Sequence, residues 1–328
     1  MANKKFRIGT FNLYNLASPG SKFYRGIRYT DEQYQAKTQW IAEQLRRIDG
    51  DIVGFQEIFD GDALRDAVDR SAVYQDATVI VGETDGQKPV VGLVSRLPVL
   101  EYEFIPGFPQ EAHLEINDMS VPCGCFSRPV LYARIELRKG LETLFFVVHL
   151  KSKNPIIRDK EHEHEPIERA IGKAKSLVVR TAEATALRCI LLSKLQGNDN
   201  PVIVVGDTND TGTAVTSEII AGTPPWRNLN HEQKLHLWDV LLYNVKDIQA
   251  RQSYRDAYYT HIHNGHYESL DHILVSQEFV HQNPKRLGQV EYVSVLNDHL
   301  VDDTLSDHKV PIWQSDHGQV AVTIRLRR

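Results

Sequence analysis

The residues best suited to chemistry in this chain are polar side chains that follow apolar runs. The clearest run is Val202–Val205, four β-branched residues after a turn-forming Asn-Asp-Asn-Pro segment, which predicts a buried strand. Gly206, Asp207 and Asn209 come directly after it. Because glycine permits a tight bend, the strand would hold a carboxylate and a carboxamide at a rigid end. On its own, the pattern is more typical of a strand closed by an ordinary Asp/Asn turn.

Other predicted strands of the chain also end in polar residues. These residues are Asn12, Glu57, His149, Asp271, and Asp316 with His317. Each is weak evidence alone, since polar residues are the usual way to end a strand. Together they include hard oxygen ligands that suit Mg²⁺ or Mn²⁺. They also offer a carboxylate and a histidine, a pair in which the carboxylate can orient the imidazole and favour its protonation near neutral pH. With Asn209 they include a carboxamide that can donate to a phosphoryl oxygen. The set indicates metal-assisted phosphoryl chemistry.

Short strands with alternating or continuous apolar residues must position these groups. We predict strands over residues 5–11, 51–57, 77–82, 90–95, 99–104, 129–137, 143–149, 202–207, 269–275, 290–295 and 320–326. A hairpin is expected around Lys139-Gly140, another turn at Asn264-Gly265, and an irregular loop from Pro106 to Arg128.

Three helical patterns accompany the strands. A capping box at Thr30 begins a helix that buries Trp40, Ile41 and Leu45, and a short helix follows over residues 63–68. A long apolar stripe from Pro166 to about residue 195 predicts a helix that covers a sheet. No repeat, low-complexity tract or linker separates these elements, so we expect one domain over residues 1–328. Strands and helices of these lengths predict two stacked sheets flanked by helices.

Composition narrows the class of protein. The chain has 328 residues, of which 41% are hydrophobic and 25% are charged, as in ordinary globular proteins. Its net charge of -5 argues against a broadly basic nucleic-acid-coating surface, while a local basic groove stays compatible with it. Neither a bilayer-spanning run nor a signal-peptide core is present, and the three cysteines cannot all pair within the chain. We expect reduced thiols, a cytoplasmic location and a monomer.

Six short motifs occur in order along nearly the whole chain. They are Thr10-Phe-Asn12, Gln56-Glu57, Val148-His149-Leu150, Gly206-Asp-Thr-Asn209, Ser269-Leu-Asp271 and Ser315-Asp-His317. As an ordered set they resemble the endonuclease/exonuclease/phosphatase superfamily, also called deoxyribonuclease-I-like. The resemblance implies an α+β fold, a four-layer α/β/β/α sandwich of two stacked mixed β-sheets flanked by helices, and a divalent-metal phosphoesterase. It casts Glu57 as the principal ligand of Mg²⁺ or Mn²⁺, with Asn12 and Asp316 nearby.

The resemblance also implies catalytic roles. Asp207 and Asn209 would position the attacking water and stabilise the transition state, and Asp271 would orient His317. His149 resembles the second histidine of the deoxyribonuclease branch, which contacts phosphate or protonates the leaving group. The motifs leave open whether Asp207 or His317 is the base.

The sequence departs from the family pattern in two places. A second Ser-Asp-His copy at Ser306–His308 precedes Pro311, and a proline shortly after the histidine is common in the family. We prefer Asp316 and His317, because a full alternating strand follows them at the chain end. Thr208 stands where the family often has an aromatic residue, which leaves the metal chemistry intact but weakens assignment to a named branch.

We favour a nuclease, acting as an endonuclease or an exonuclease. Cations lie next to several strand ends: Lys22, Arg25 and Arg28 follow the strand that ends at Asn12, Lys151 and Lys153 follow His149, and Arg128 opens the strand at Pro129. A polyanion that spans several cations gains from each contact, and we predict that Arg128 and Lys151 bind substrate phosphate. Tyr24 and Tyr29 are suited to stacking on bases.

Two other functions remain open. The first is a phosphatase or phosphodiesterase that acts on a lipid or small-molecule phosphoester, although no clear exposed apolar loop for a membrane surface stands out. The second is a non-catalytic member of the fold that only binds. Intact Glu57, Asp207, Asn209 and His317 speak against the second, because a decayed site should lose at least one of them.

Overall fold

The computed structural model describes most of the chain. It covers residues 5–21, 23, 26–116, 119–157, 163–223, 230–250, 258–263, 266–302 and 310–327. Several predictions fall outside these residues: Lys22, Tyr24, Arg25, the Asn264-Gly265 turn and the second Ser-Asp-His copy at 306–308.

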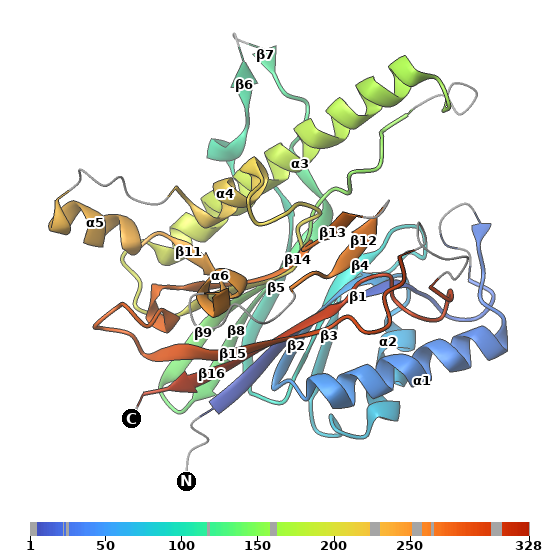
Figure 1. Cartoon of the computed structure of the whole chain (residues 1–328), viewed down its shortest axis with the longest axis horizontal. Coiled ribbons are helices and arrows are strands. Elements are labelled where there is room, and N and C mark those ends of the chain that lie inside the picture. The colour runs from blue at the N-terminus through green and yellow to red at the C-terminus, as the bar shows by residue number, and fades with distance from the viewer. Residues whose placement is uncertain are drawn as a thin grey trace.

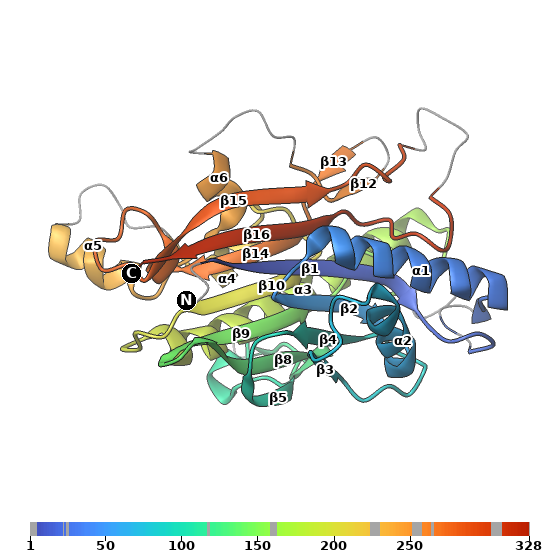
Figure 2. The same cartoon turned by 90° about the horizontal axis from the view of Figure 1, so that it is seen from below.

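Two mixed six-stranded sheets form the centre of the molecule (Figures 1 and 2). In the first sheet the order is β15 (Gly288–Leu296), β16 (Gln319–Leu326), β1 (Lys5–Leu16), β2 (Ile52–Ile58), β4 (Val90–Ser95) and β3 (Thr78–Val81). In the second sheet it is β11 (Leu242–Asn244), β14 (Asp271–Ser276), β10 (Val202–Asp207), β9 (Leu141–His149), β8 (Cys125–Arg138) and β5 (Val99–Gly107). Within each sheet one pair is parallel: β1 with β2, and β9 with β10.

Helices cover the outer faces of both sheets. Helices α1 (Asp31–Ile48) and α2 (Gly61–Ser71) pack on the first sheet, and α3 (Pro166–Leu195) packs on the second, with α4 (Val215–Ala221) against α3 (Figure 2). The remaining elements include the short helices α5 (His231–Trp238) and α6 (Val245–Ala250) and the hairpins β6 (Glu115–Ile116)–β7 (Met119–Ser120) and β12 (His261–His263)–β13 (His266–Glu268). Two 3-10 helices, Gln110–Ala112 and Gln277–Phe279, complete the described elements. The layers follow the predicted α/β/β/α order.

The sheets bury one apolar layer between them. Ile8, Val147 and Val205 belong to this layer, and each is inaccessible to solvent. Gly54 on β2 faces Val205 so closely that an added Cβ would lie 2.5 Å from its side chain. The sheets therefore approach across a glycine, because interiors pack too densely to admit one more methyl group there.

The helix starts agree with the sequence signals. Thr30 caps α1 through its side chain, and Gln33 completes the capping box. Pro166 occupies the first turn of α3. Backbone N–H groups in this turn have no intrahelical acceptor, so the lack of an N–H in proline removes no helical hydrogen bond.

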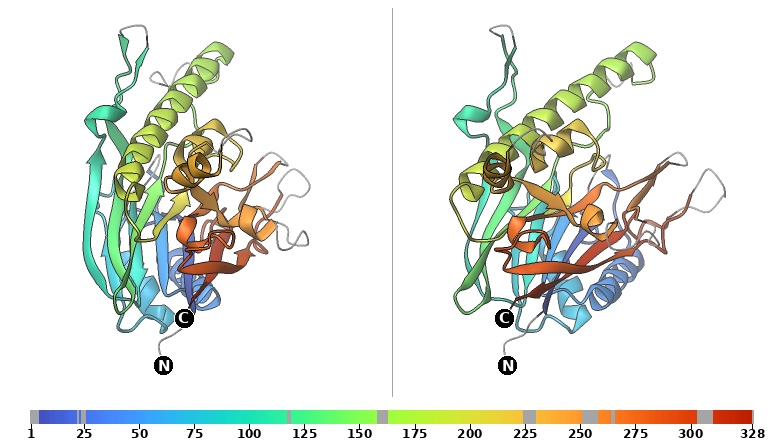
Figure 3. Two further views of the ribbon diagram at one scale, coloured as in Figure 1. Left: turned by 90° about the vertical axis from the view of Figure 1, so that its left-hand side faces the viewer. Right: turned by 60° about the vertical axis from the view of Figure 1, so that its left-hand side comes forward.

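One prediction for α3 was only half right. The C-terminal half covers the second sheet with Leu187 and Leu191, but the N-terminal half extends past the sheet, and Ile167 is 73% exposed (Figure 3). In this N-terminal half, α3 contacts the loop that follows β9. Gly172 lies against Pro155, and the Ser176 hydroxyl donates to the Asn154 carbonyl.

The segment from Pro106 to Arg128 is more regular than predicted. Strand β5 continues to Gly107 and pairs there with Cys125, the first residue of β8, after a shift in register. The described cysteines are all unpaired, and no described helix is long and apolar enough to cross a membrane.

Candidate active site

Strand direction brings the predicted polar residues to one edge of the two sheets. The parallel strands β1 and β2 carry Asn12 and Glu57 toward this edge, and β9 and β10 end there with His149 opposite Asp207. Strand β14 runs the other way, so its first residue, Asp271, lies opposite Asp207. The direction and register of the strands therefore bring residues that are distant in sequence to the same end of the two sheets.

These strand ends open into a cleft of about 440 Å³. Its lining includes Glu57, Arg128, His149, Lys153, Asp207, Asn209, His261, Glu268, Asp316 and His317. Asn12 and Asp271 lie just beneath it, each at most 1% exposed.

A carboxylate–histidine pair lies at the base of the cleft. The Nδ1 atom of His317 is 2.8 Å from Oδ2 of Asp271. The Ser315 hydroxyl donates to the Asn12 carbonyl and accepts from the His317 backbone N–H, which ties this loop to β1. Burial alone would lower the pKa of the His317 imidazole. The negative charge of Asp271, together with those of Asp207 and Asp316, outweighs the effect of burial and raises this pKa well above 6.5.

Asp207 and Asn209 are held by the turn after β10. Asp207 Oδ1 accepts the Asn209 backbone N–H at 2.8 Å, and Asn209 Nδ2 donates to the Leu150 carbonyl at 3.1 Å. Burial raises the pKa of Asp207 to about 7, although the charge of His317 opposes the shift. Gly206 has a φ of +143°, and an added Cβ would lie 2.0 Å from the Val148 carbonyl oxygen. Glycine is required at this turn.

Glu57 and Asp316 form the most acidic part of the cleft. Glu57 accepts the Asn15 backbone N–H at 3.0 Å and the Asn12 amide at 3.4 Å. Burial, and then the negative charge of Asp316, raise the pKa of Glu57. Asp316 Oδ1 is buried and has no hydrogen-bond partner among the described residues. An oxygen-preferring dication fits here, because it would satisfy that atom and relieve the repulsion between the carboxylates.

The amide of Asn12, the third predicted metal ligand, contacts two carboxylates of the cleft. Its Nδ2 faces Glu57 and Asp207, at 3.4 and 3.2 Å, while its Oδ1 accepts the Tyr14 backbone N–H. In this arrangement Asn12 holds the carboxylates in place and has its oxygen engaged elsewhere, so a ligand role would need the amide to turn.

His149 is buried beside the carboxylates and stays neutral. Its Nε2 lies 3.6 Å from Asp207 Oδ2 and 4.0 Å from Glu57 Oε1. Burial, followed by the positive charges of Arg128 and His317, lowers the pKa of His149 well below 6.5. A neutral imidazole at this place is suited to contacting a phosphate as a hydrogen-bond donor.

The predicted phosphate-binding cations lie in different surroundings. Arg128 lines the cleft and donates to the Leu150 carbonyl. Lys151 instead directs its ammonium to the carbonyls of Ser152 and Asn154 and is not among the lining residues. Lys153 lines the cleft in its place and pairs with Glu268 at 3.0 Å.

Tyr29 was predicted to stack on bases, and this is wrong. Its ring is only 3% exposed, and its hydroxyl donates to the backbone carbonyls of Tyr14 and Asn15. It supports the left-handed backbone of these two residues at the end of β1.

Sequence reasoning missed two residues near the site. Lys37 of α1 is fully buried, and its ammonium donates to the Tyr14 carbonyl at 2.9 Å. No local signal reveals it, since a lysine on an amphipathic helix normally faces solvent. His261 lies 4.8 Å from the His317 ring, centroid to centroid. Its alternation with His263 on one strand face was an available signal.

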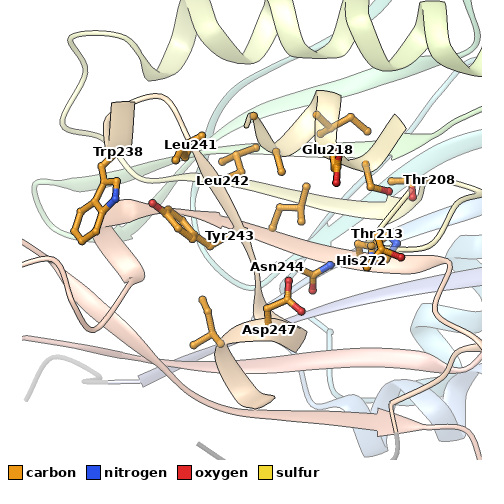
Figure 4. Close-up of a pocket in the computed structure, with 17 residues that line it drawn as sticks. Thr208, Thr213, Glu218, Trp238, Leu241, Leu242, Tyr243, Asn244, Asp247 and His272 are labelled. Carbon is orange, nitrogen blue, oxygen red and sulfur yellow. Dashed lines mark hydrogen bonds between the residues drawn. The ribbon is translucent and has the colours of Figure 1, made fainter. Parts of the chain in front are cut away.

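A second cavity, of about 420 Å³, lies behind the same strand ends (Figure 4). Thr208 and His272, next in sequence to Asp207 and Asp271, line it together with Trp238, Tyr243 and several leucines. His272 is fixed there, because Asn244 Nδ2 donates to its Nδ1 at 2.9 Å and its Nε2 donates to the Asp210 carbonyl at 2.8 Å. The strand pleat thus separates a polar cleft from a largely apolar cavity.

Comparison with known proteins agrees with this architecture. The model of the Endonuclease/Exonuclease/phosphatase family matches residues 9–317. None of the curated protein sequences matches the chain.

Solved structures resemble the whole chain. D. rerio TDP2 complexed with single strand DNA product has a TM-score of 0.57 at 17% identity, with 98% of this chain and 100% of that chain covered. An endonuclease/exonuclease/phosphatase from Bacteroides vulgatus gives 0.56 at 16%, covering 99% and 100%. The mannosyl-6-phosphatase of Bacteroides thetaiotaomicron gives 0.54 at 16%, covering 97% and 99%. At these identities the likeness concerns the fold, and it confirms the predicted four-layer sandwich.

Proposed function

Because the chain belongs to the endonuclease/exonuclease/phosphatase family of phosphoester hydrolases, we propose that it is a divalent-metal-dependent phosphodiesterase whose substrate is nucleic acid. One observation carries the proposal. The Asp271–His317 pair faces the same cleft as Glu57, Asp207 and Asn209. A cleft that joins an oriented imidazole to a metal-binding carboxylate is what hydrolysis of a phosphodiester requires.

Glu57 and Asp316 would hold Mg²⁺ or Mn²⁺, joined by Asn12 once its amide has turned its oxygen toward the ion. The ion would neutralise charge that develops on the phosphoryl oxygens. We assign Asp207 as the base, since its pKa of about 7 lets it accept a proton from water near neutral pH. His317, which is protonated at that pH, would donate a hydrogen bond or a proton to the phosphoryl group.

Two further groups would bind the phosphate. Asn209 has a second amide hydrogen beyond the one given to Leu150, and this hydrogen is available to a phosphoryl oxygen. His149 would donate from its neutral ring, and Arg128 would add a fixed positive charge at the cleft wall.

Nucleic acid is favoured as the substrate by the cations of the cleft. Arg128 and Lys153 line it, and Arg28 is exposed at the end of the loop after β1. A polyanion would gain from contacts with successive phosphates, to an extent that salt screens. The likeness to a TDP2 structure that holds a single-strand DNA product supports this choice at the level of the fold.

A small phosphoester is the second candidate. Glu268 neutralises Lys153 at the cleft, and the chain carries a net charge of -5, so long-range attraction for a polyanion is weak. A fold neighbour named as a mannosyl-6-phosphatase supports this alternative equally.

A substrate panel tests the proposal. Purified protein is given plasmid DNA, short single strands of DNA and RNA, a sugar phosphomonoester and phospholipid vesicles, each with Mg²⁺ and with EDTA. An Asp207→Asn variant, purified in parallel, controls for contaminating nucleases. We expect Mg²⁺-dependent cleavage of nucleic acid that falls steeply as salt rises. Turnover of the sugar phosphate or lipid alone would reject nucleic acid, and nucleic-acid binding without any turnover would indicate a non-catalytic protein.

A further inference from the structure

A group of nitrogen and oxygen ligands lies on one wall of the cleft. His261, Asp316 and His317 each offer one ligand atom, and these atoms lie within 4.8 Å of one another. His261 comes from β12, whereas the other two precede β16. None of the roles proposed above uses His261.

Among the described residues, each of the two histidines forms its ring hydrogen bond through Nδ1, and none is formed through Nε2. The Nδ1 atom of His261 is 3.0 Å from the Asp316 carbonyl oxygen, which can only accept, so the ring hydrogen lies on Nδ1. Asp271 holds Nδ1 of His317 in the same way at 2.8 Å. Metal-binding histidines in proteins are oriented by this device, because a carbonyl or carboxylate on one nitrogen presents the lone pair of the other.

The third ligand is a carboxylate oxygen without a partner. Asp316 Oδ1 is buried, and no described residue forms a hydrogen bond with it. The rings of His261 and His317 are neighbours, with centroids 4.8 Å apart and an interplanar angle of 33°. The three ligand atoms, which lie within 4.8 Å of one another, are close enough together for one ion.

We propose that His261, His317 and Asp316 bind a transition-metal dication of the Zn²⁺ class, at a position separate from the oxygen-lined one at Glu57. Two imidazoles and one carboxylate suit Zn²⁺, whereas Mg²⁺ prefers oxygen ligands only. Three protein ligands leave a coordination position open toward the cleft.

Occupancy of this site inhibits hydrolysis, a consequence that rests on the proposed function. Zinc binding at His317 Nε2 displaces the proton that this nitrogen carries near neutral pH and releases it to solvent, so the imidazole can no longer donate a proton at that atom. Asp316 is shared between the two positions, and the ions therefore compete for its carboxylate.

Zinc binding is measured first, on full-length protein stripped of metal. A chromogenic chelator competes for Zn²⁺ in the presence of excess Mg²⁺, and visible absorption of the Co²⁺-loaded protein reports ligation by imidazole. His261→Gln removes one ligand with little change in volume. His263→Gln is the matched control, because His263 lies on the same strand with its ring 6.2 Å from that of His261 but outside the ligand group.

We expect His261→Gln to weaken Zn²⁺ binding by about tenfold or more and to change the Co²⁺ spectrum, while His263→Gln behaves as the wild type. Equal zinc affinity in the wild type and His261→Gln would overturn the site. In a separate arm, Zn²⁺ is titrated into Mg²⁺-activated enzyme, and His261→Gln should need more zinc for half-inhibition. Equal inhibition would overturn the inhibitory role. Because binding is measured without turnover, failure of the proposed function would leave the zinc result interpretable.

Discussion

The cleft and the second cavity lie on opposite sides of the same strand ends, and each contains a buried histidine. In the cleft, His317 is held by the Asp271 carboxylate at Nδ1, and no described residue forms a hydrogen bond with its Nε2. In the cavity, His272 has both nitrogens engaged, one by the Asn244 amide and one by the Asp210 carbonyl. Burial opposes charge on both rings, yet the pKa of His317 is raised, whereas that of His272 is lowered.

The difference between the two histidines lies in their partners. A buried imidazole carries a proton at neutral pH only where a carboxylate compensates its charge. In His272, neutral groups form hydrogen bonds with both ring nitrogens, so the side chain stabilises the local structure and has no ring nitrogen left to bind a substrate. Chemistry should therefore be confined to the cleft, and stability should depend on both sites.

The largest effect should come from removing the metal-binding carboxylate. Glu57→Ala is expected to abolish hydrolysis at any Mg²⁺ concentration, because no other described side chain replaces its oxygens beside Asp316. EDTA should abolish wild-type activity in the same way, and Mg²⁺ or Mn²⁺ should restore it. Undiminished turnover by the variant at saturating Mg²⁺ would remove Glu57 from the mechanism.

The histidines provide the direct test of the comparison. His317→Ala should lower kcat by roughly two orders of magnitude or more, the usual scale for loss of a general acid or base. His272→Gln should leave kcat of the folded protein nearly unchanged but lower the free energy of unfolding by about 1–3 kcal/mol, since a buried partner is left unsatisfied. Steady-state kinetics and urea denaturation of both variants separate the two roles.

His308 is the control for the duplicated signature. His308→Ala should leave turnover intact if Asp316 and His317 are the functional copy. A large loss in His308→Ala, with His317→Ala unaffected, would show that the other copy is the catalytic one.

Weakening the partner of His317 should have a smaller effect than removing His317. Asp271→Asn keeps the shape and the hydrogen-bond acceptor, so we expect a decrease in kcat of about tenfold, within the range for loss of a supporting partner. The pKa of His317 should also fall, because Asp271 is the strongest influence that raises it. Activity that needs protonated His317 would then decline at a lower pH than in the wild type, which a pH–rate profile measures.

The smallest effect concerns stability and pH. Burial lowers the pKa of His272 in the folded protein, so the unfolded chain takes up a proton near the ordinary value of 6.5 while the folded chain does not. The contribution of His272 is therefore complete above that value and declines as pH falls, by at most about 1.4 kcal/mol per pH unit. The difference in unfolding free energy between the wild type and His272→Gln should shrink between about pH 7.5 and 5.5 in urea titrations. A gap that widens on acidification would contradict the neutral assignment.

Local patterns were enough to predict most of the fold. Alternating apolar residues and the capping box at Thr30 are properties of adjacent residues, and the strands and α1 follow from them. The ordered motifs also placed Asp207, Asp271 and His317 at one edge, because a strand end fixes its neighbour in register.

Features that depend on tertiary contacts could not be predicted in this way. Lys37 is buried because the ends of β1 and the loop before β16 close over it, which its own helix does not encode. Lys151 and Lys153 both follow His149 closely in sequence, and the conformation of the loop decides which one lines the cleft. Lys151 donates to the Ser152 and Asn154 carbonyls, whereas Lys153 lines the cleft. The exposed half of α3 has the same apolar periodicity as its buried half.

Gly206 has no functional group that could take part in a reaction, yet we expect it to tolerate substitution as poorly as Asp207 does. An added methyl group would meet the Val148 carbonyl oxygen, so β9 and β10 would have to separate and His149 and Asp207 would move apart. In a deep mutational scan scored by activity, position 206 would be indistinguishable from the acidic residue beside it. Tolerance to substitution therefore maps the geometry that a site needs as well as the atoms that it uses.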